Sequence, residues 1–477
     1  MTTIDLDHAA ALGVRASVKA SRLAPAASRL GRGPYARWRG GERLSMLFVG
    51  YNGAGNVGAD ARVAAMARQF EAVLGAQGVE ISVLTQETEH FRRYVGPRVG
   101  LVRIDPIFFG SVLRACSASH LAVLSEGSAL KSNLANALTL LFCEAAGVMK
   151  AQAKPCIAYG CDAGRMDDFV RTLAADLCSE TYFLARAEPS LAAARELGLR
   201  GHLGTDPAWT FPGKGGGWVE ARLAEVGWDG RRPLIGAAVT NPFRWPVKPS
   251  LARLLVAAAR GDWEDHYRRW YFFSSTAEGR RRFDAYLRAV AAALDNAARR
   301  HGAVVLILGL DARDLDACRR LQLLVSSPSE IFSAHQYDGY ELCAVLRRLS
   351  VLLTSDYHGR ILSMPAGVPA IALSLDERLL NLYEETGQRG ELYFEAGEEG
   401  LTEKLDGAVE LAVRERERIT AETLAFMPGA LESLGRMGLF MRRYVEESFP
   451  GIALGPAPRT WQDALGPVEK SLERFLV

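Results

Sequence analysis

The chain has 477 residues, of which 49% are hydrophobic, and 57 basic side chains stand against 55 acidic ones. This length predicts more than one domain, and a net charge of +2 gives no field that would attract nucleic acid. The apolar runs are too short for a transmembrane helix and no signal peptide is recognisable, so we expect a cytoplasmic protein. Seven scattered cysteines, without a Cys-x-x-Cys pair, predict buried thiols and no metal site.

The first 43 residues form a basic extension. Between Val14 and Arg43 the sequence has eight arginines and lysines and only one acidic residue, Glu42. Such an arm could contact anionic lipid or another polyanion, or it could be a flexible or packed extension with no partner. A peripheral membrane contact through this arm is therefore one expectation for the protein. The sequence indicates no oligomeric state.

From Leu44 onward, short apolar runs alternate with helical patterns in two successive series. The predicted strands are 44–51, 79–84, 99–104, 120–125, 155–159, 181–185, 234–239, 304–308, 330–333, 351–354, 370–373 and 391–394. This alternation predicts an α/β fold with two Rossmann-like domains and a cleft between them. The expected parts are an N-terminal domain over 44–212, a linker over 213–232, a C-terminal domain over 233–425 and a helical extension over 426–477.

Polar residues follow the first predicted strand, where residues 51–60 open the first helix. A Gly-x-Gly-x-x-Gly pattern beginning at Gly53 has the form of the dinucleotide fingerprint, although the next strand lacks the terminal acid that the fingerprint requires. Glycines let the backbone approach a ligand, and a helix N-terminus offers free N–H groups. Asn52, Asn56 and Asp60 add polar groups that a simple turn does not need, so we expect them to bind an acceptor.

Two later strand ends carry further candidates. Glu126 follows the strand at 120–125 and could be a general base or bind an acceptor hydroxyl, while Ser128 could join it or merely cap the next helix. Arg186 follows the strand at 181–185. Its planar fork suits a carboxylate or a phosphate, although an ion pair with Glu188 is the alternative.

Residues 355–361 are the most informative segment. His358 lies with Tyr357 and Arg360 where a buried strand meets a short helix, which is the edge of an α/β sheet where ligands bind. Imidazole titrates near neutral pH and can give or take a proton. His358 is therefore the predicted catalytic residue, with a structural histidine as the alternative.

Taken together, five ordered motifs resemble the polysaccharide pyruvyl transferase family over most of residues 45–425. The matching segments are Asn52–Asp60; Ser125–Gly127 with Ala153–Gly160; Arg186–Ser190 with Glu196–Gly198; Asp206–Ala208; and Asp356–His358 with Ala366–Pro369 and Leu375–Arg378. The resemblance implies a glycosyltransferase-B (GT-B) architecture. It also implies transfer of a pyruvyl group from phosphoenolpyruvate to a sugar hydroxyl of a surface glycan or glycolipid, which gives a ketal.

The same resemblance assigns roles to the candidate residues. It implies that His358 is the acid or base, that Arg186, Tyr357, Arg360 and Arg378 hold the donor, and that the acceptor meets Asn52, Asn56, Asp60, Glu126 and Ser128. Phosphoenolpyruvate would be a co-substrate, with no other cofactor and no metal.

Two other functions fit the same pattern. Asp356 stands where the resembled family has an arginine, and an acid suits the hydroxyls of a ribose or a sugar. A nucleotide-sugar-dependent glycosyltransferase of the same fold is therefore the alternative enzyme. A non-catalytic glycan-binding protein, anchored by its basic arm, is the alternative outside enzymes.

Overall fold

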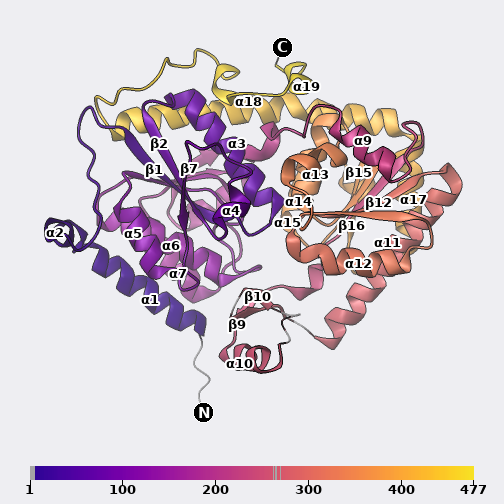
Figure 1. The fold of residues 1–477 in the computed structure, drawn as a ribbon, viewed down its shortest axis with the longest axis horizontal. Coiled ribbons are helices and arrows are strands. Elements are labelled where there is room, and N and C mark those ends of the chain that lie inside the picture. The colour runs from indigo at the N-terminus through magenta and orange to yellow at the C-terminus, as the bar shows by residue number, and fades with distance from the viewer. Residues whose placement is uncertain (1–5, 262, 264–265, 269, 275, 477) are drawn as a thin grey trace.

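The computed structural model describes residues 6–261, 263, 266–268, 270–274 and 276–476. Figure 1 shows two α/β halves side by side, with a long C-terminal helix that runs across both. The first half contains a seven-stranded sheet and the second a six-stranded sheet. Both sheets are parallel and helices flank them, so the prediction of two Rossmann-like domains is confirmed.

The first sheet has the strand order β3-β2-β1-β4-β5-β6-β7. From β1 the chain first adds strands on one side, and at β4 it continues on the other side, so the order of connection reverses between β1 and β4. Its strands are β1 (Leu44–Asn52), β2 (Val79–Thr85), β3 (Gly100–Arg103), β4 (Leu121–Leu124), β5 (Cys156–Cys161), β6 (Tyr182–Ala185) and β7 (Arg200–Leu203). β7 is absent from the predicted strands because it lies at the sheet edge and has no apolar run.

The helices of the first half connect these strands. They are α3 (Val57–Leu74), α4 (Thr88–Phe91), α5 (Phe109–Ser117), α6 (Asn136–Ala151), α7 (Asp168–Leu177), α8 (Glu188–Glu196) and the 3-10 turn η1 (Pro207–Thr210). α3 begins at its predicted place because the Asn56 side chain accepts a hydrogen bond from the Ala59 N–H at 2.9 Å. Its apolar stripe, Val63, Met66 and Phe70, is fully buried.

The second sheet has the order β13-β12-β8-β14-β15-β16 and reverses between β8 and β14. Its strands are β8 (Leu234–Ala238), β12 (Val304–Gly309), β13 (Ser329–Ser333), β14 (Val351–Thr354), β15 (Ala370–Ser374) and β16 (Tyr393–Glu395). The helices here are α9 (Trp218–Glu225), α11 (Ala277–His301), α12 (Leu315–Leu324), α13 (Gly339–Leu346), α14 (Tyr357–Ser363), α15 (Glu377–Glu385), α16 (Arg389–Leu392) and α17 (Leu401–Arg414). Short 3-10 turns are η2 (Pro242–Arg244), η3 (Ala312–Asp314) and η4 (Met364–Ala366).

Residues 245–274 form an insert between β8 and α11. It contains β9 (Lys248–Pro249), α10 (Leu251–Arg260), β10 (His266–Arg268) and β11 (Tyr271–Phe272), which Figure 1 shows as a separate unit below the two halves. Strands this short leave no hydrophobic period, so the sequence does not predict them. The insert contacts the first half, because the Val247 N–H donates to the Leu134 carbonyl at 2.9 Å.

The basic N-terminal extension packs against the first half. It forms α1 (Leu6–Ser21) and α2 (Ala24–Arg29), and its first five residues lie outside the described ranges. Val14 is fully buried, and the Ser17 hydroxyl donates to the buried carboxyl of Glu144. Burial raises the pKa of Glu144 to about 8. Membrane contact through this extension stays a prediction. Among the helices described, none combines the length and the apolar character that crossing a membrane requires.

The C-terminal helix joins the two halves. α18 (Arg416–Ser448) is followed by η5 (Asp463–Leu465) and α19 (Lys470–Glu473). α18 itself packs on the first half: its Met437 sulfur contacts the Thr205 N–H at 3.1 Å, and its Leu434 carbonyl accepts a hydrogen bond from the Gln69 side chain at 3.0 Å. The predicted helical extension over 426–477 therefore falls partly in this helix, which begins earlier, at Arg416, and ends at Ser448; after it only η5 and α19 are helical among the described residues.

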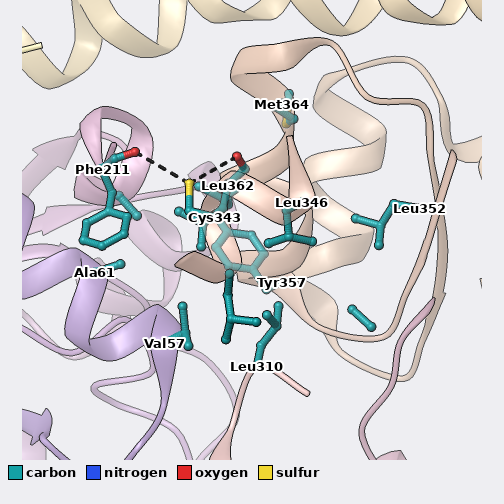
Figure 2. Close-up of a cluster of buried hydrophobic side chains, with 14 of the residues drawn as sticks. Val57, Ala61, Phe211, Leu310, Cys343, Leu346, Leu352, Tyr357, Leu362 and Met364 are labelled. Carbon is teal, nitrogen blue, oxygen red and sulfur yellow. Dashed lines mark hydrogen bonds between the residues drawn. The ribbon is translucent and has the colours of Figure 1, made fainter. Parts of the chain in front are cut away.

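A shared apolar core holds the two halves together. In Figure 2, Val57 and Ala61 of α3 lie beside Leu310, Cys343 and Tyr357 of the second half. Two backbone hydrogen bonds cross the same boundary, from Val57 to Leu310 and from Ala312 to Gly55, each at 2.9 Å. The halves are therefore closed on each other along α3.

The packing of α18 gives a matched pair of glycine variants. A Cβ added at Gly435 would overlap the Trp461 carbonyl oxygen, whereas one at Gly429 meets nothing within 4 Å. We expect Gly435→Ala to lower the free energy of unfolding by about 1–3 kcal/mol, because overpacking strains a well-filled contact. Gly429→Ala should raise it by about 0.5–1 kcal/mol through helix propensity. Chemical denaturation measures both, and equal effects would contradict the α18 packing.

Candidate functional site

The reversal points of the two sheets meet at one cavity. Ligands in open α/β sheets bind at the carboxyl ends of the strands where the order reverses. Here those ends are the loops after β1 and β4 in the first half and after β8 and β14 in the second. All four loops line a cavity of about 380 Å³, through Asn56, Glu126, Thr240 and Ser355 among others. The fold therefore places one candidate site between its halves.

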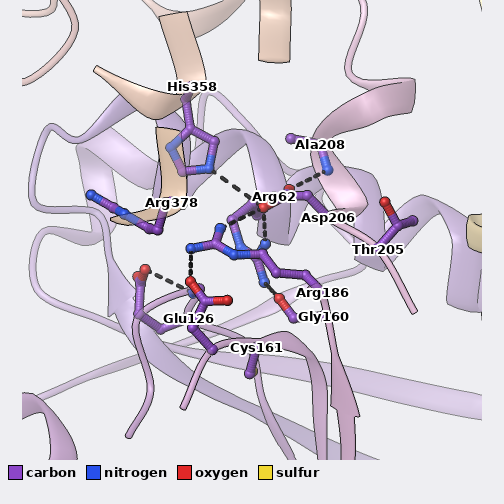
Figure 3. Close-up of polar contacts among 12 residues, drawn as sticks. Arg62, Glu126, Gly160, Cys161, Arg186, Thr205, Asp206, Ala208, His358 and Arg378 are labelled. Carbon is purple, nitrogen blue, oxygen red and sulfur yellow. Dashed lines mark hydrogen bonds and ion pairs between the residues drawn. The ribbon is translucent and has the colours of Figure 1, made fainter. Parts of the chain in front are cut away.

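A cluster of arginines and aspartates lies beneath this site (Figure 3). The Arg186 guanidinium donates to the Asp206 carboxylate at 2.8 Å and also pairs with Asp162. Arg62, which lies on α3, pairs with the same Asp206 carboxylate. All four side chains are buried. Burial alone would raise the pKa of Asp206, but Arg62, His358 and Arg186 hold it well below its usual range. The cluster is thus charge-paired without any ligand.

His358 sits on this cluster from the other half of the molecule. Its Nε2 lies 3.8 Å from the Asp206 Oδ2, and a Cβ added at Gly58 would overlap the imidazole. Burial, assisted by the nearby Arg186 and against the effect of Asp206, lowers the pKa of His358 to about 3. The ring is therefore neutral at neutral pH and holds no second proton to donate. His358 lines the cavity, and its catalytic role stays a prediction.

The predicted donor residues separate into two groups. Tyr357 and Arg378 lie near the cluster, with the Arg186 guanidinium 4.5 Å from the Tyr357 ring centroid. Arg186 has both terminal nitrogens on aspartates, so its predicted binding of a free anion would require breaking those pairs. Arg378 lines the cavity but pairs with Asp376, two residues earlier.

Arg360 does not reach the site, which corrects its predicted role. It donates to the Val368 carbonyl at 2.9 Å, the Gln388 side chain at 2.7 Å and the Thr423 hydroxyl at 3.1 Å. Residues two apart on a helix do not share a face, so His358 and Arg360 point in different directions from α14. Arg360 fastens α14 to α18.

The predicted acceptor residues also separate. Asn56 lines the cavity and donates to Asp311 at 2.9 Å, and Glu126 and Ser128 line it too. Asn52 and Asp60 instead face the protein interior, which corrects their predicted exposure to a ligand.

Their partners explain this orientation. The Asn52 side chain donates to the Leu84 carbonyl at 3.0 Å, which ties β1 to β2. Asp60 accepts the Gly53 N–H at 2.7 Å and contacts His90 Nε2 at 3.2 Å. Both residues therefore shape the turn after β1 rather than the cavity wall.

Five charged residues of the cavity wall had no predicted role: Arg244, Asp311, Arg313, Asp314 and Asp376. Arg313 donates to the Tyr51 hydroxyl at 3.0 Å and lies over the Tyr267 ring, 4.3 Å from its centroid. Arg244 pairs with Asp314 at 3.1 Å. The signal that could have found three of them is their position directly after the predicted strand 304–308.

Two acids of the wall have raised pKa values. Burial, and then the neighbouring Asp311, raise the pKa of Asp314 to about 7. Burial also raises the pKa of Asp356, whose carboxylate accepts the Gly359 N–H at 2.9 Å and so caps α14. Capping explains an acid at this position without any contact to a donor. In the described ranges, no group of three or more histidines, cysteines or acids is placed to hold a metal ion.

No family model matches the sequence. No curated protein matches it either.

Solved structures resemble the fold at very low sequence identity. One is a Listeria monocytogenes protein assigned as a UDP-N-acetylglucosamine 2-epimerase (TM-score 0.52, 10% identity, covering 87% of this chain and 100% of that one). Another is Staphylococcus aureus MnaA with UDP (0.53, 9%, 87% and 99%). A third is Anabaena HepE in complex with UDP-glucose (0.50, 9%, 84% and 100%).

These likenesses give the chain a GT-B-type fold of two Rossmann-like domains. They also correct the family resemblance drawn from the motifs, because the neighbours are UDP-N-acetylglucosamine 2-epimerases and glycosyltransferases rather than pyruvyl transferases. In this chain several of the motif residues lie at strand ends and helix caps. Asp206, for example, caps η1 by accepting the Ala208 N–H at 2.9 Å.

The depressed pKa of His358 predicts a pH effect on stability. Between pH 6.5 and about 3 the unfolded histidine carries a proton that the folded one lacks, so folding loses stability as pH falls. We expect the stability advantage of the wild type over His358→Gln to shrink by about 2 kcal/mol from pH 8 to pH 5. Urea denaturation of both proteins at the two pH values measures it. A constant difference would contradict a buried neutral imidazole.

Proposed function

We propose that the chain is a nucleotide-sugar-dependent enzyme that transfers the sugar to an acceptor hydroxyl in the inter-domain cleft. The convergence of both sheet reversal points on one cavity carries this proposal, because such points bind ligands in α/β folds. The cavity of about 380 Å³ falls within the usual size of small-molecule sites, roughly 300–1,000 Å³. The GT-B-type neighbours, which include complexes with UDP and UDP-glucose, support the ligand class.

The charged wall of the second half would hold the donor. Arg313 and Arg244 are two of its cations, and beside them Tyr267 stacks on Tyr51 of the first half, which gives the wall an aromatic surface next to the charges. Each arginine already has an aspartate partner, so the donor diphosphate would compete with Asp311 and Asp314. The raised pKa of Asp314 leaves this acid partly neutral near pH 7, which weakens its repulsion of the diphosphate.

The first half would supply the acceptor side. Glu126 lines the cavity, and one of its carboxylate oxygens accepts the Gly127 N–H at 2.8 Å. This carboxylate would accept the proton of an acceptor hydroxyl as that hydroxyl attacks the sugar. The new bond joins the acceptor oxygen to the anomeric carbon, and the nucleoside diphosphate leaves with the electrons of the broken bond. His358 and Asp356 border the same space from the opposite side.

Ligand-induced melting shifts test the donor. We expect one member of a panel of UDP-, GDP- and dTDP-sugars to stabilise the protein by about 2.7 kcal/mol at 100 times its Kd, whereas phosphoenolpyruvate should give no shift. Arg313→Gln should weaken donor binding at least tenfold, because it removes a positive charge that the diphosphate would recruit from its pair with Asp311. The matched control is Arg281→Gln, an exposed arginine on α11 whose partner is Glu278 one turn away.

Three outcomes would count against the proposal. The absence of any shift across the panel would exclude nucleotide-sugar binding, and an unchanged shift in Arg313→Gln would exclude the assigned donor wall. If the protein converts the nucleotide sugar to its epimer without any acceptor, the proposed donor class would stand and the proposed transfer reaction would be excluded.

A further inference from the structure

The cavity extends beyond the polar loops into a region lined by hydrocarbon and aromatic side chains. This region, here termed the apolar arm, is lined by Ile104, Phe108, Leu138, Leu141, Val247 and Trp270. The residues come from three segments: the loop before α5, the first two turns of α6, and the insert. None of these six side chains carries a charge, in contrast to the aspartates and arginines at the strand ends.

The arm is a built cavity wall rather than an exposed patch. Ile104 and Leu141 belong to the buried core that α1, α5 and α6 share. Val247 and Tyr271 are buried in the insert's own apolar cluster, which packs on Ala135 next to α6. The arm therefore lies where the insert closes on the first half, and the hydrogen bond from Val247 to Leu134 holds the two sides together.

The two ends of the cavity suit the two ends of an amphiphile. Hydroxyl groups entering the apolar arm would lose water without gaining hydrogen-bond partners, whereas a hydrocarbon chain gains free energy on burial there. Glu126 and Asp356 line the polar end, and a carboxylate is able to accept hydrogen bonds from the hydroxyls of a head group. Apolar side chains also mark the outer surface of the same segments, where Ile107 is 63% exposed and Leu255 of α10 is 69% exposed.

We propose that the apolar arm binds the hydrocarbon chain of an amphiphilic acceptor, and that the acceptor's hydroxyl head group lies at Glu126. This inference rests on the proposed function and narrows its acceptor to a lipid-like alcohol or glycolipid. The acceptor hydroxyl loses its proton to Glu126, its oxygen bonds to the anomeric carbon, and the nucleoside diphosphate is released.

A chain-length series tests the arm with the full-length protein. The probes are methyl, butyl, hexyl and octyl β-D-glucopyranoside, each kept below its critical micelle concentration, with binding measured by calorimetry. Affinity should rise about threefold to fourfold for each added methylene until the arm is filled, from the ~0.8 kcal/mol that each buried methylene contributes. Equal affinities from methyl to octyl would overturn the proposal.

A matched pair of variants separates the arm from non-specific detergent binding. Leu138→Trp should fill the arm and lower octyl glucoside affinity at least tenfold, toward the methyl value. Leu323→Trp, at a leucine of α12 that is 87% exposed, should keep the wild-type chain-length dependence. Loss of the dependence in both variants, or in neither, would overturn the proposal. If Leu138→Trp fails to fold, Phe108→Ala at a partly buried ring of the arm replaces it and should lower octyl glucoside affinity with little change for the methyl compound.

The outcomes also distinguish this inference from the proposed function. A donor-induced melting shift without chain-length dependence would overturn the apolar arm and leave nucleotide-sugar binding in place. Chain-length dependence without a shift from any donor would overturn the proposed transfer reaction and support the arm as an amphiphile site.

Discussion

The buried carboxylate of Asp206 is the charge around which both halves are arranged. It accepts Arg62 from α3 and Arg186 from the end of β6, and His358 of the second half faces it. Ions removed from water are stable only when paired, and deleting one partner of a buried pair typically costs about 3–5 kcal/mol. The Asp206 pairs therefore hold the loops of the first sheet in place and provide the surface on which His358 and α14 rest.

The closed arrangement of the halves follows from this contact. His358 fits against α3 only because Gly58 has no side chain, and the shared apolar core continues along α3 from that point. Closure brings the reversal points of both sheets to one cavity, and the insert covers its remaining side. The cavity consequently has a polar end at the strand termini and an apolar end under the insert, which is the basis for proposing both a donor class and an acceptor class.

Much of the fold could be predicted from the sequence, because buried parallel strands read as short apolar runs between helical patterns. The strand after which His358 lies, β14, was predicted at its observed bounds. The insert could not be predicted, since its strands of two or three residues carry no periodicity and its packing depends on Ala135 in a distant segment. The insert supplies Val247 and Trp270 of the apolar arm, so the sequence did not predict that part of the site either.

The site was predicted in location more than in detail. Glu126, Ser128, Asn56, His358 and Arg378 do line the cavity. Asn52, Asp60 and Arg360 do not, because each satisfies buried backbone or side-chain partners that only the tertiary structure brings near. The family resemblance was wrong because its motifs consist of helix caps and strand-end turns. Such residues are required by the fold and do not identify one reaction.

The most direct test of the central claim is a crystal structure of the protein soaked with the nucleotide sugar that stabilises it most. The account predicts density for the sugar diphosphate in the cavity between the Asn56 turn and the start of α14, with Arg313 within hydrogen-bond distance of a phosphate oxygen. A cavity that stays empty at saturating ligand, or a ligand bound elsewhere on the molecule, would contradict it.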